Sequence, residues 1–175
     1  MMKFAATILA LTALSSLPAL ANDSDSAFFK KVTGKWAGPG EIVAGKYKGT
    51  KFTCNFDGST ASASNGMTMD GTCRVGVFTQ AMKATVAMTG GSYKGSFLDG
   101  SDGKGLDITA GNVSGNRATF ALNRKQLNGA MLARLSGDSA MNVTISVRVN
   151  KDMVPVIGMS LKRLDDTATG TVAKK

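Results

Sequence analysis

Short stretches in which apolar and polar residues alternate recur through this 175-residue sequence, and they constrain its fold more than any other feature. The clearest is MNVTISVRV, residues 141–149, where every odd position is apolar and every even position between them is polar. A period of two is typical of a β-strand with one buried and one exposed face. Weaker versions of the pattern occur at residues 81–88, 117–122 and 130–137. The chain is therefore predicted to consist mainly of strands.

Turn-forming residues separate these segments, among them Gly90-Gly91, Asn128-Gly129 and Asn150-Lys151-Asp152. Only residues 25–34, DSAFFKKVTG, have a helical pattern. Many short sequential strands leave exposed edges unless the sheet closes on itself. We therefore expect an all-β fold, a closed antiparallel up-and-down barrel of about eight to ten strands with one short N-terminal helix.

The first residues have the features of an export signal: Lys3, then an apolar run from Phe4 to Leu17, then small residues at Ala19-Leu20-Ala21. The run is too short to cross a bilayer, so no transmembrane segment is predicted. A lipid anchor is not expected either, because no cysteine lies near Ala21. The predicted organisation is a signal peptide (1–21), an N-terminal segment with the helix (22–32), a barrel domain (33–165) and a flexible tail (166–175). The predicted location is periplasmic or secreted.

Cys54 and Cys73 are the two cysteines of the chain, and an oxidising compartment favours a disulfide between them. Their flanking segments alternate like strands and are separated by turn-forming residues that end at Asn65-Gly66. A hairpin would place both sulfurs on one face, which we expect to be core and to include Phe52, Phe56, Val75 and Val77. A redox-active pair is not indicated, because the spacing is not Cys-x-x-Cys.

The chain is basic, with a formal net charge of +9. Positive potential attracts anionic lipids, glycans or acidic partners, although it can also serve only solubility. The candidate contacts for a ligand or partner at the barrel rim are Lys46, Lys48, Lys94, Arg117 and Arg134. Nucleic acid is not expected as a partner, because no strand presents a row of aromatic residues on which bases could stack.

The sequence contains no histidine, which removes the commonest general base and the usual nucleophile-histidine systems. The acidic residues lie mainly at Asp-Gly turns, so we predict no catalytic residues, no cofactor and no enzyme activity. Methionines could supply thioether ligands to copper(I), but methionine more commonly fills cores, and no metal site is predicted. The methionines considered for copper are Met67, Met69, Met82 and Met88.

The segment TGKWAG contains the only tryptophan, Trp36, on the first predicted strand after the helix. It resembles the Gly-x-Trp signature of lipocalins and the wider calycin superfamily. The resemblance implies that Gly34 and Trp36 lie at the bottom of a barrel and that a basic residue from a late strand, Arg163 or Lys162, packs over the indole. It also implies a structural role for Trp36 and a small ligand held inside the barrel.

A second resemblance is to the Inh-type periplasmic inhibitors of secreted metalloproteases, which are barrels with an early Gly-x-Trp and one disulfide. It is carried by GKW, Cys54 and the segment DGTC that ends at Cys73, and the chain is longer than that family needs. It implies inhibition by a flexible N-terminal segment, here Asn22 to Phe28. The function predicted first is an exported, non-enzymatic barrel that binds a small amphipathic or lipid-like ligand, and protease inhibition is the alternative.

Overall fold

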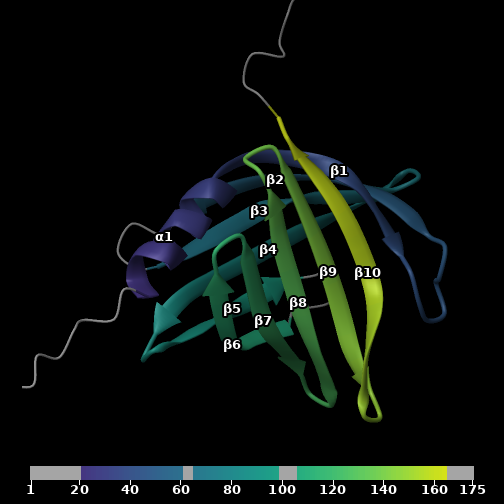
Figure 1. Cartoon of the computed structure of the whole chain (residues 1–175). Coiled ribbons are helices and arrows are strands. Elements are labelled where there is room, and N and C mark those ends of the chain that lie inside the picture. The colour runs from purple at the N-terminus through teal and green to yellow at the C-terminus, as the bar shows by residue number, and fades with distance from the viewer. Residues whose placement is uncertain (1–20, 61–64, 99–105, 165–175) are drawn as a thin grey trace, which may run out of the picture.

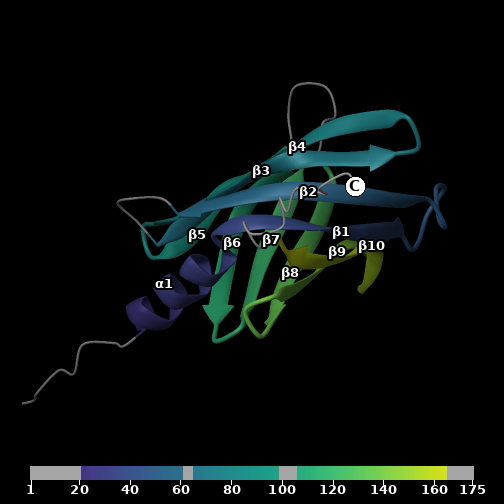
Figure 2. The ribbon, with the colours of Figure 1, turned by 90° about the horizontal axis from the view of Figure 1, so that it is seen from above.

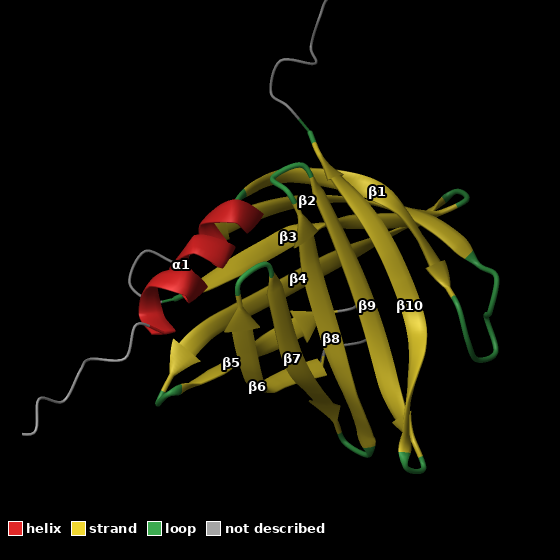
Figure 3. Cartoon of the chain, in the orientation of Figure 1, coloured by secondary structure: helices red, strands yellow, loops and turns green. Residues whose placement is uncertain are grey.

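The structure, a computed structural model, describes residues 21–60, 65–98 and 106–164. One helix is followed by ten strands, and strands dominate the fold (Figure 3). The elements are α1 (Ala21–Val32), β1 (Gly34–Ile42), β2 (Lys51–Thr60), β3 (Gly66–Val75), β4 (Phe78–Thr89), β5 (Ser92–Leu98), β6 (Leu106–Ser114), β7 (Arg117–Arg124), β8 (Leu127–Ser136), β9 (Ala140–Val149) and β10 (Asp152–Arg163).

All neighbouring strands are antiparallel, and β1 closes the sheet by pairing with β10. Trp36 lies opposite Arg163 at one end of this closing pair, and Ile42 lies opposite Ile157 toward the other end. Closure satisfies the backbone hydrogen bonds of both terminal strands, which an open sheet would leave exposed. The predicted all-β, closed antiparallel barrel with one short helix is confirmed, with ten strands.

The alternation in β9 predicts its inner face correctly. Met141, Val143 and Ile145 are buried, whereas Val147 is half-buried and Val149 is exposed. All five side chains belong to the inner face of the strand, so the burial of inward side chains decreases along the barrel axis, from Met141 toward Val149. The barrel is therefore packed at one end and looser at the other.

Helix α1 covers the packed end, which we call the closed end (Figures 1 and 2). The opposite end, the open end, carries the β1–β2, β3–β4, β7–β8 and β9–β10 connections. Both views show the β1–β2 and β3–β4 connections far from α1. The residues described include no helix that is long and apolar enough to cross a membrane.

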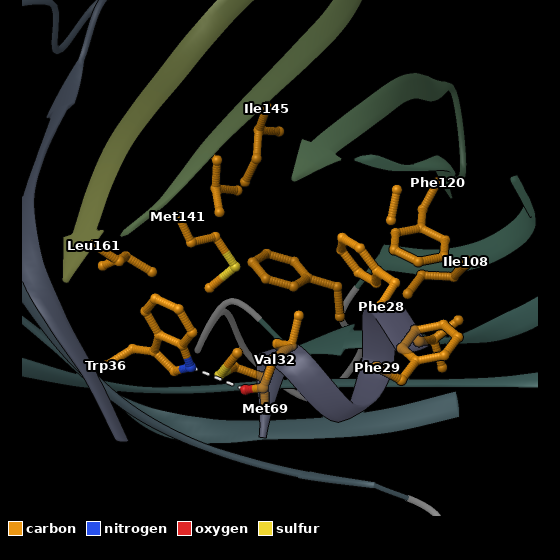
Figure 4. Packing of buried hydrophobic residues seen from close by; sticks show 14 of the residues in the cluster. Phe28, Phe29, Val32, Trp36, Met69, Ile108, Phe120, Met141, Ile145 and Leu161 are labelled. Carbon is orange, nitrogen blue, oxygen red and sulfur yellow. Dashed lines mark hydrogen bonds between the residues drawn. The ribbon is translucent and has the colours of Figure 1, made fainter. Parts of the chain in front are cut away.

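The core is concentrated beneath α1. Phe28, Phe29 and Val32 of the helix are each only 2% exposed, and they lie among the inner side chains of the barrel (Figure 4). The Phe29 and Tyr93 ring centroids are 5.5 Å apart in an edge-to-face arrangement, which is a favoured geometry for aromatic pairs. The apolar face of α1 thus fills the closed end of the barrel together with the inward side chains of the strands.

Three predictions concern residues that lie wholly or partly outside the described ranges. They are the signal peptide at 1–21, of which only Ala21 is described, the flexible tail at 166–175, and the limit of the barrel domain at residue 165. The last described strand residue is Arg163.

Candidate ligand-binding cavity

A cavity of about 570 Å³, the outer chamber, occupies the open half of the barrel. Its walls come from the open-end halves of the strands, whose inner side chains are mostly aliphatic or aromatic. The lining residues are Ile42, Phe52, Phe56, Cys73, Val75, Phe78, Thr79, Gln80, Met82, Phe97, Leu106, Leu122, Leu127, Gly129, Ile145, Ser146, Val147, Val156, Ile157 and Met159.

A second cavity, the inner chamber, lies deeper and contains only about 70 Å³. Phe28 and Val32 of α1 form part of its wall, and Phe56, Met82, Phe97 and Met159 line both chambers. The barrel interior is therefore nearly filled by side chains near the helix and hollow toward the open end. The described residues include no element at the open end that would fill the outer chamber as α1 fills the closed end.

The outer chamber is apolar, and no charged side chain contributes to its lining among the described residues. The polar residues of its lining are Thr79, Gln80 and Ser146, and Gln80 Nε2 donates to the Ala81 carbonyl at 3.4 Å. Such a lining favours hydrocarbon or aromatic groups by the hydrophobic effect and offers few polar contacts to orient them. In this part of the chain no cluster of three or more His, Cys, Asp or Glu could hold a metal ion.

The disulfide between Cys54 and Cys73 is confirmed. It joins β2 to β3 at directly opposite positions, and both residues are buried. Met159 Sδ lies 4.0 Å from Cys54 Sγ, so the disulfide forms part of the barrel wall beside the cavity.

The face expected to surround the disulfide as core was only partly correct. Phe52 and Phe56 are partly buried and pack against the core, but Val75 is 42% exposed and Val77 is 89% exposed. Val75 is the last residue of β3, and Val77 lies in the turn before β4. The alternation identifies the inward face but not how near a residue is to the open end.

Trp36 is fully buried at the closed end, and its Nε1 donates to the Val32 carbonyl at 2.9 Å (Figure 4). The Arg163 guanidinium carbon lies 4.4 Å from the centre of the indole ring, within cation–π range. Trp36 lines neither chamber. Of the two basic residues expected near the indole, Arg163 is the one that contacts it.

Arg163 also binds backbone carbonyls at the closed end. Its guanidinium donates to the Lys31 and Thr33 carbonyls and, through Nε, to the Asp138 carbonyl at 2.7 Å. The last carbonyls of a helix have no partner within the helix, so a side-chain donor at this position stabilises its C-terminus. One arginine thus joins α1, β1 and the β8–β9 connection to the last strand.

Gly34 is required by this arrangement for two separate reasons. Its φ of +105° is a conformation that L side chains rarely adopt, and a Cβ atom there would lie 2.8 Å from Arg163 Nη1. The guanidinium therefore occupies the space that a side chain at residue 34 would need.

A second contact between α1 and the barrel was not predicted from the sequence. Tyr93 Oη donates to Asp25 Oδ2 at 2.6 Å, and both residues are buried. Burial, together with the hydrogen bond and the charge of Asp25, raises the pKa of Tyr93 above its ordinary value. No local sequence signal pairs two residues that are 68 positions apart.

The expectation that Asn22 to Phe28 forms a flexible arm was wrong. These residues belong to α1, Asp25 is bonded to Tyr93, and Phe28 is 2% exposed. Phe28 and Phe29 are each only 2% exposed, and burial of their apolar side chains inside the barrel stabilises the docked helix.

The basic residues proposed for the rim do not gather at one end. Lys46 and Lys48 lie in the β1–β2 connection at the open end. Lys94, Arg117 and Arg134 are exposed, and each is next in sequence to a buried residue, so their side chains lie on the outer face of the barrel. Arg117 and Arg134 lie opposite each other on β7 and β8, toward the closed end. These three residues face away from both chambers, so the expectation that they contact a ligand at the barrel mouth is wrong.

The methionines considered for copper are part of the barrel interior. Met67, Met69 and Met82 line the inner chamber, and Met88 packs against the core. Met131, Met141 and Met159 also line the inner chamber. Thioether side chains are flexible and polarisable, so this wall can adapt its shape to what lies beside it.

No protein-family model matches this sequence, and no curated protein sequence does either. Among solved structures, the chain is similar to the crystal structure of Rv2717c from M. tuberculosis, with a TM-score of 0.56 and 11% sequence identity. The match covers 81% of this chain and 98% of that chain. At this identity the likeness supports the overall fold alone.

Proposed function

We propose that this protein is an exported, non-enzymatic barrel that binds a small apolar or amphipathic molecule, such as a lipid-like compound, in its outer chamber. The observation that carries the proposal is the apolar cavity of about 570 Å³ at the end of the barrel opposite α1. Its size lies within the roughly 300–1,000 Å³ of typical small-molecule sites. A barrel whose interior serves only as a core has no need of such a volume.

The distribution of polarity supports an amphipathic ligand. The apolar part would lie against shared walls such as Met82 and Phe97, and a polar group would remain near the open end. This orientation leaves the polar group hydrated and avoids the cost of burying it without partners. The absence of histidine from the sequence and the apolar character of the lining support binding rather than catalysis.

Export is supported by the N-terminal sequence and by the disulfide. Lys3, the apolar run and Ala19-Leu20-Ala21 have the order of a cleavable signal. The Cys54–Cys73 bond is consistent with an oxidising compartment outside the cytoplasm.

The test is a titration with cis-parinaric acid, a fatty acid that fluoresces in apolar surroundings. Val147 lines the outer chamber, so Val147→Trp should fill part of it and weaken binding at least about tenfold, since a clash with the ligand costs more than 1.4 kcal/mol. Thr144→Trp is the matched control, because Thr144 lies on the opposite face of the same strand. Native mass spectrometry of the protein as purified would identify any retained ligand.

Saturable binding by the wild type and Thr144→Trp, but not by Val147→Trp, supports the proposal. Absence of saturable binding to the wild type, or equal loss in both variants at unchanged melting temperature, contradicts it. No observation on the described residues favours protease inhibition, because the segment that would enter a protease is docked in the barrel.

A further inference from the structure

Large exposed apolar residues are concentrated at one end of the molecule. Of the ten among the described residues, eight belong to the open end, Leu98 lies opposite Lys83 midway along β4, and only Leu164 belongs to the closed end. The eight, which we call the apolar rim, are Val43, Tyr47, Val75, Val77, Phe78, Leu127, Val149 and Met153. Exposed apolar residues are ordinary when they are scattered, but a concentration at one end indicates an interaction surface.

Three members of the apolar rim project furthest from the core. Val77 is 89% exposed, Phe78 is 79% exposed and Tyr47 is 62% exposed. They lie in or beside the β3–β4 and β1–β2 connections, both of which are far from α1 (Figures 1 and 2). Packing within the barrel does not account for their apolar character, since their side chains are mostly in water.

The strand connections of the open end are also basic. The described connections of the open end contain four lysines and no acidic residue: Lys46, Lys48, Lys125 and Lys151. Glu41 and Asp152 flank these connections, and Glu41 lies opposite Lys51 in the register of β1 and β2. At the closed end the described strand connections contain Asp138 and no lysine, and two lysines of that end, Lys30 and Lys31, belong to the last turn of α1.

The apolar rim is also continuous with the outer chamber. Val75, Phe78 and Leu127 are exposed and at the same time line the chamber. A surface that covered the rim would therefore face the chamber opening directly.

We propose that the open end docks onto the surface of a membrane that contains anionic phospholipid. Tyr47, Val77 and Phe78 would enter the boundary between headgroups and acyl chains, and the four lysines would contact the anionic headgroups. Aromatic and aliphatic side chains combined with lysine are the combination that interfacial binding requires. The proposal goes beyond ligand binding in the chamber, and docking would place the chamber opening against the lipid.

The experiment measures co-sedimentation of the mature protein with two kinds of vesicle. One contains equal parts of phosphatidylglycerol and phosphatidylcholine, and the other contains phosphatidylcholine alone. We expect binding to the anionic vesicles to be at least about tenfold tighter and to weaken with added salt, because the lysines attract the headgroups electrostatically.

Two pairs of variants separate the apolar and electrostatic contributions. Tyr47→Ser with Val77→Ser, two rim residues that do not line the outer chamber, should weaken binding about tenfold or more, whereas Leu164→Ser, an exposed apolar residue at the closed end, should change it less than about twofold. Lys46→Glu with Lys48→Glu should abolish the preference for anionic vesicles, and Lys94→Glu with Arg117→Glu, on the outer face, should largely keep it. All these residues are exposed, and circular dichroism with thermal unfolding verifies the fold.

The proposal is overturned if the wild type does not bind anionic vesicles at low salt, or if the variants of each pair lose binding equally. Binding to heparin without binding to vesicles would also overturn it and would indicate a glycan partner. Titration of every variant with cis-parinaric acid distinguishes the two proposals, since the rim variants should keep chamber binding even if docking is lost.

Discussion

Replacement of Trp36 by alanine should destabilise the barrel strongly while leaving its binding properties intact. The indole is fully buried, so the lost burial and the cavity should cost about 3–5 kcal/mol. The same change removes the Nε1 donor to the Val32 carbonyl, worth about 1 kcal/mol, and the contact with Arg163, worth about 0.5–2 kcal/mol. These contributions overlap, so we expect a total of about 4–5 kcal/mol.

Trp36→Phe separates the ring from its polar atom. It retains most of the apolar contact and a ring face for Arg163, but it loses the hydrogen bond to Val32. We expect a cost of about 2 kcal/mol, because a buried carbonyl without its donor costs about 1–3 kcal/mol.

Arg163→Ala should cost about as much as Trp36→Phe or more, because the guanidinium also binds the Lys31, Thr33 and Asp138 carbonyls. A double-mutant cycle between Trp36→Ala and Arg163→Ala isolates their direct contact. The coupling free energy should be about 0.5–2 kcal/mol, with the double variant less destabilised than the sum of the single variants.

The assay is urea unfolding followed by circular dichroism, with the slope used to verify two-state behaviour. As the only tryptophan, Trp36 also reports its own environment by fluorescence in the wild type. Coupling below about 0.3 kcal/mol, a Trp36→Ala cost below about 1 kcal/mol, or a solvent-exposed emission maximum would refute the structural role. Because Trp36 lines neither chamber, Trp36→Phe should bind cis-parinaric acid with unchanged affinity.

Three further changes test the other contacts of the closed end and the barrel wall. The raised pKa of Tyr93 means that the unfolded chain loses this proton first above about pH 10, so wild-type stability should fall there, and more steeply than that of Tyr93→Phe, in urea melts at several pH values. Replacing Cys54 and Cys73 together by alanine should lower stability by about 3 kcal/mol, because a loop of 19 residues is released in the unfolded chain; an unchanged midpoint in non-reducing urea would contradict this. Gly34→Ala should cost about 1–3 kcal/mol in the same assay from its positive φ and its approach to Arg163, and an Arg163→Ala background should reduce that cost.

The architecture could be predicted from the sequence because it depends on local patterns. The alternation of Met141, Val143 and Ile145 defines an inward face whichever strands lie beside it. The disulfide followed for the same reason, since Cys54 and Cys73 lie in consecutive strands that form one hairpin.

The candidate site was harder to predict because it depends on position along the barrel axis. Val75 and Val77 have the same apolar character as core residues, yet both lie at the open end. The alternation of a strand indicates which side chains point inward, but it does not indicate how far each of them lies from the open end. The Asp25–Tyr93 hydrogen bond escaped prediction because it depends on where α1 docks.

The contact between Arg163 and the end of α1 has a consequence for how the chain folds. Arg163 and Thr33 are 130 residues apart, and β1 completes its pairing only when β10 arrives. Such non-local contacts slow folding, because a long loop must be closed before they contribute any stability. The barrel therefore cannot close until almost all of the described chain is available. During synthesis, or during export with the N-terminus first, the barrel would remain open until β10 has emerged. Truncations before Arg163 should accumulate as open sheets with unpaired edges on β1 and are expected to aggregate.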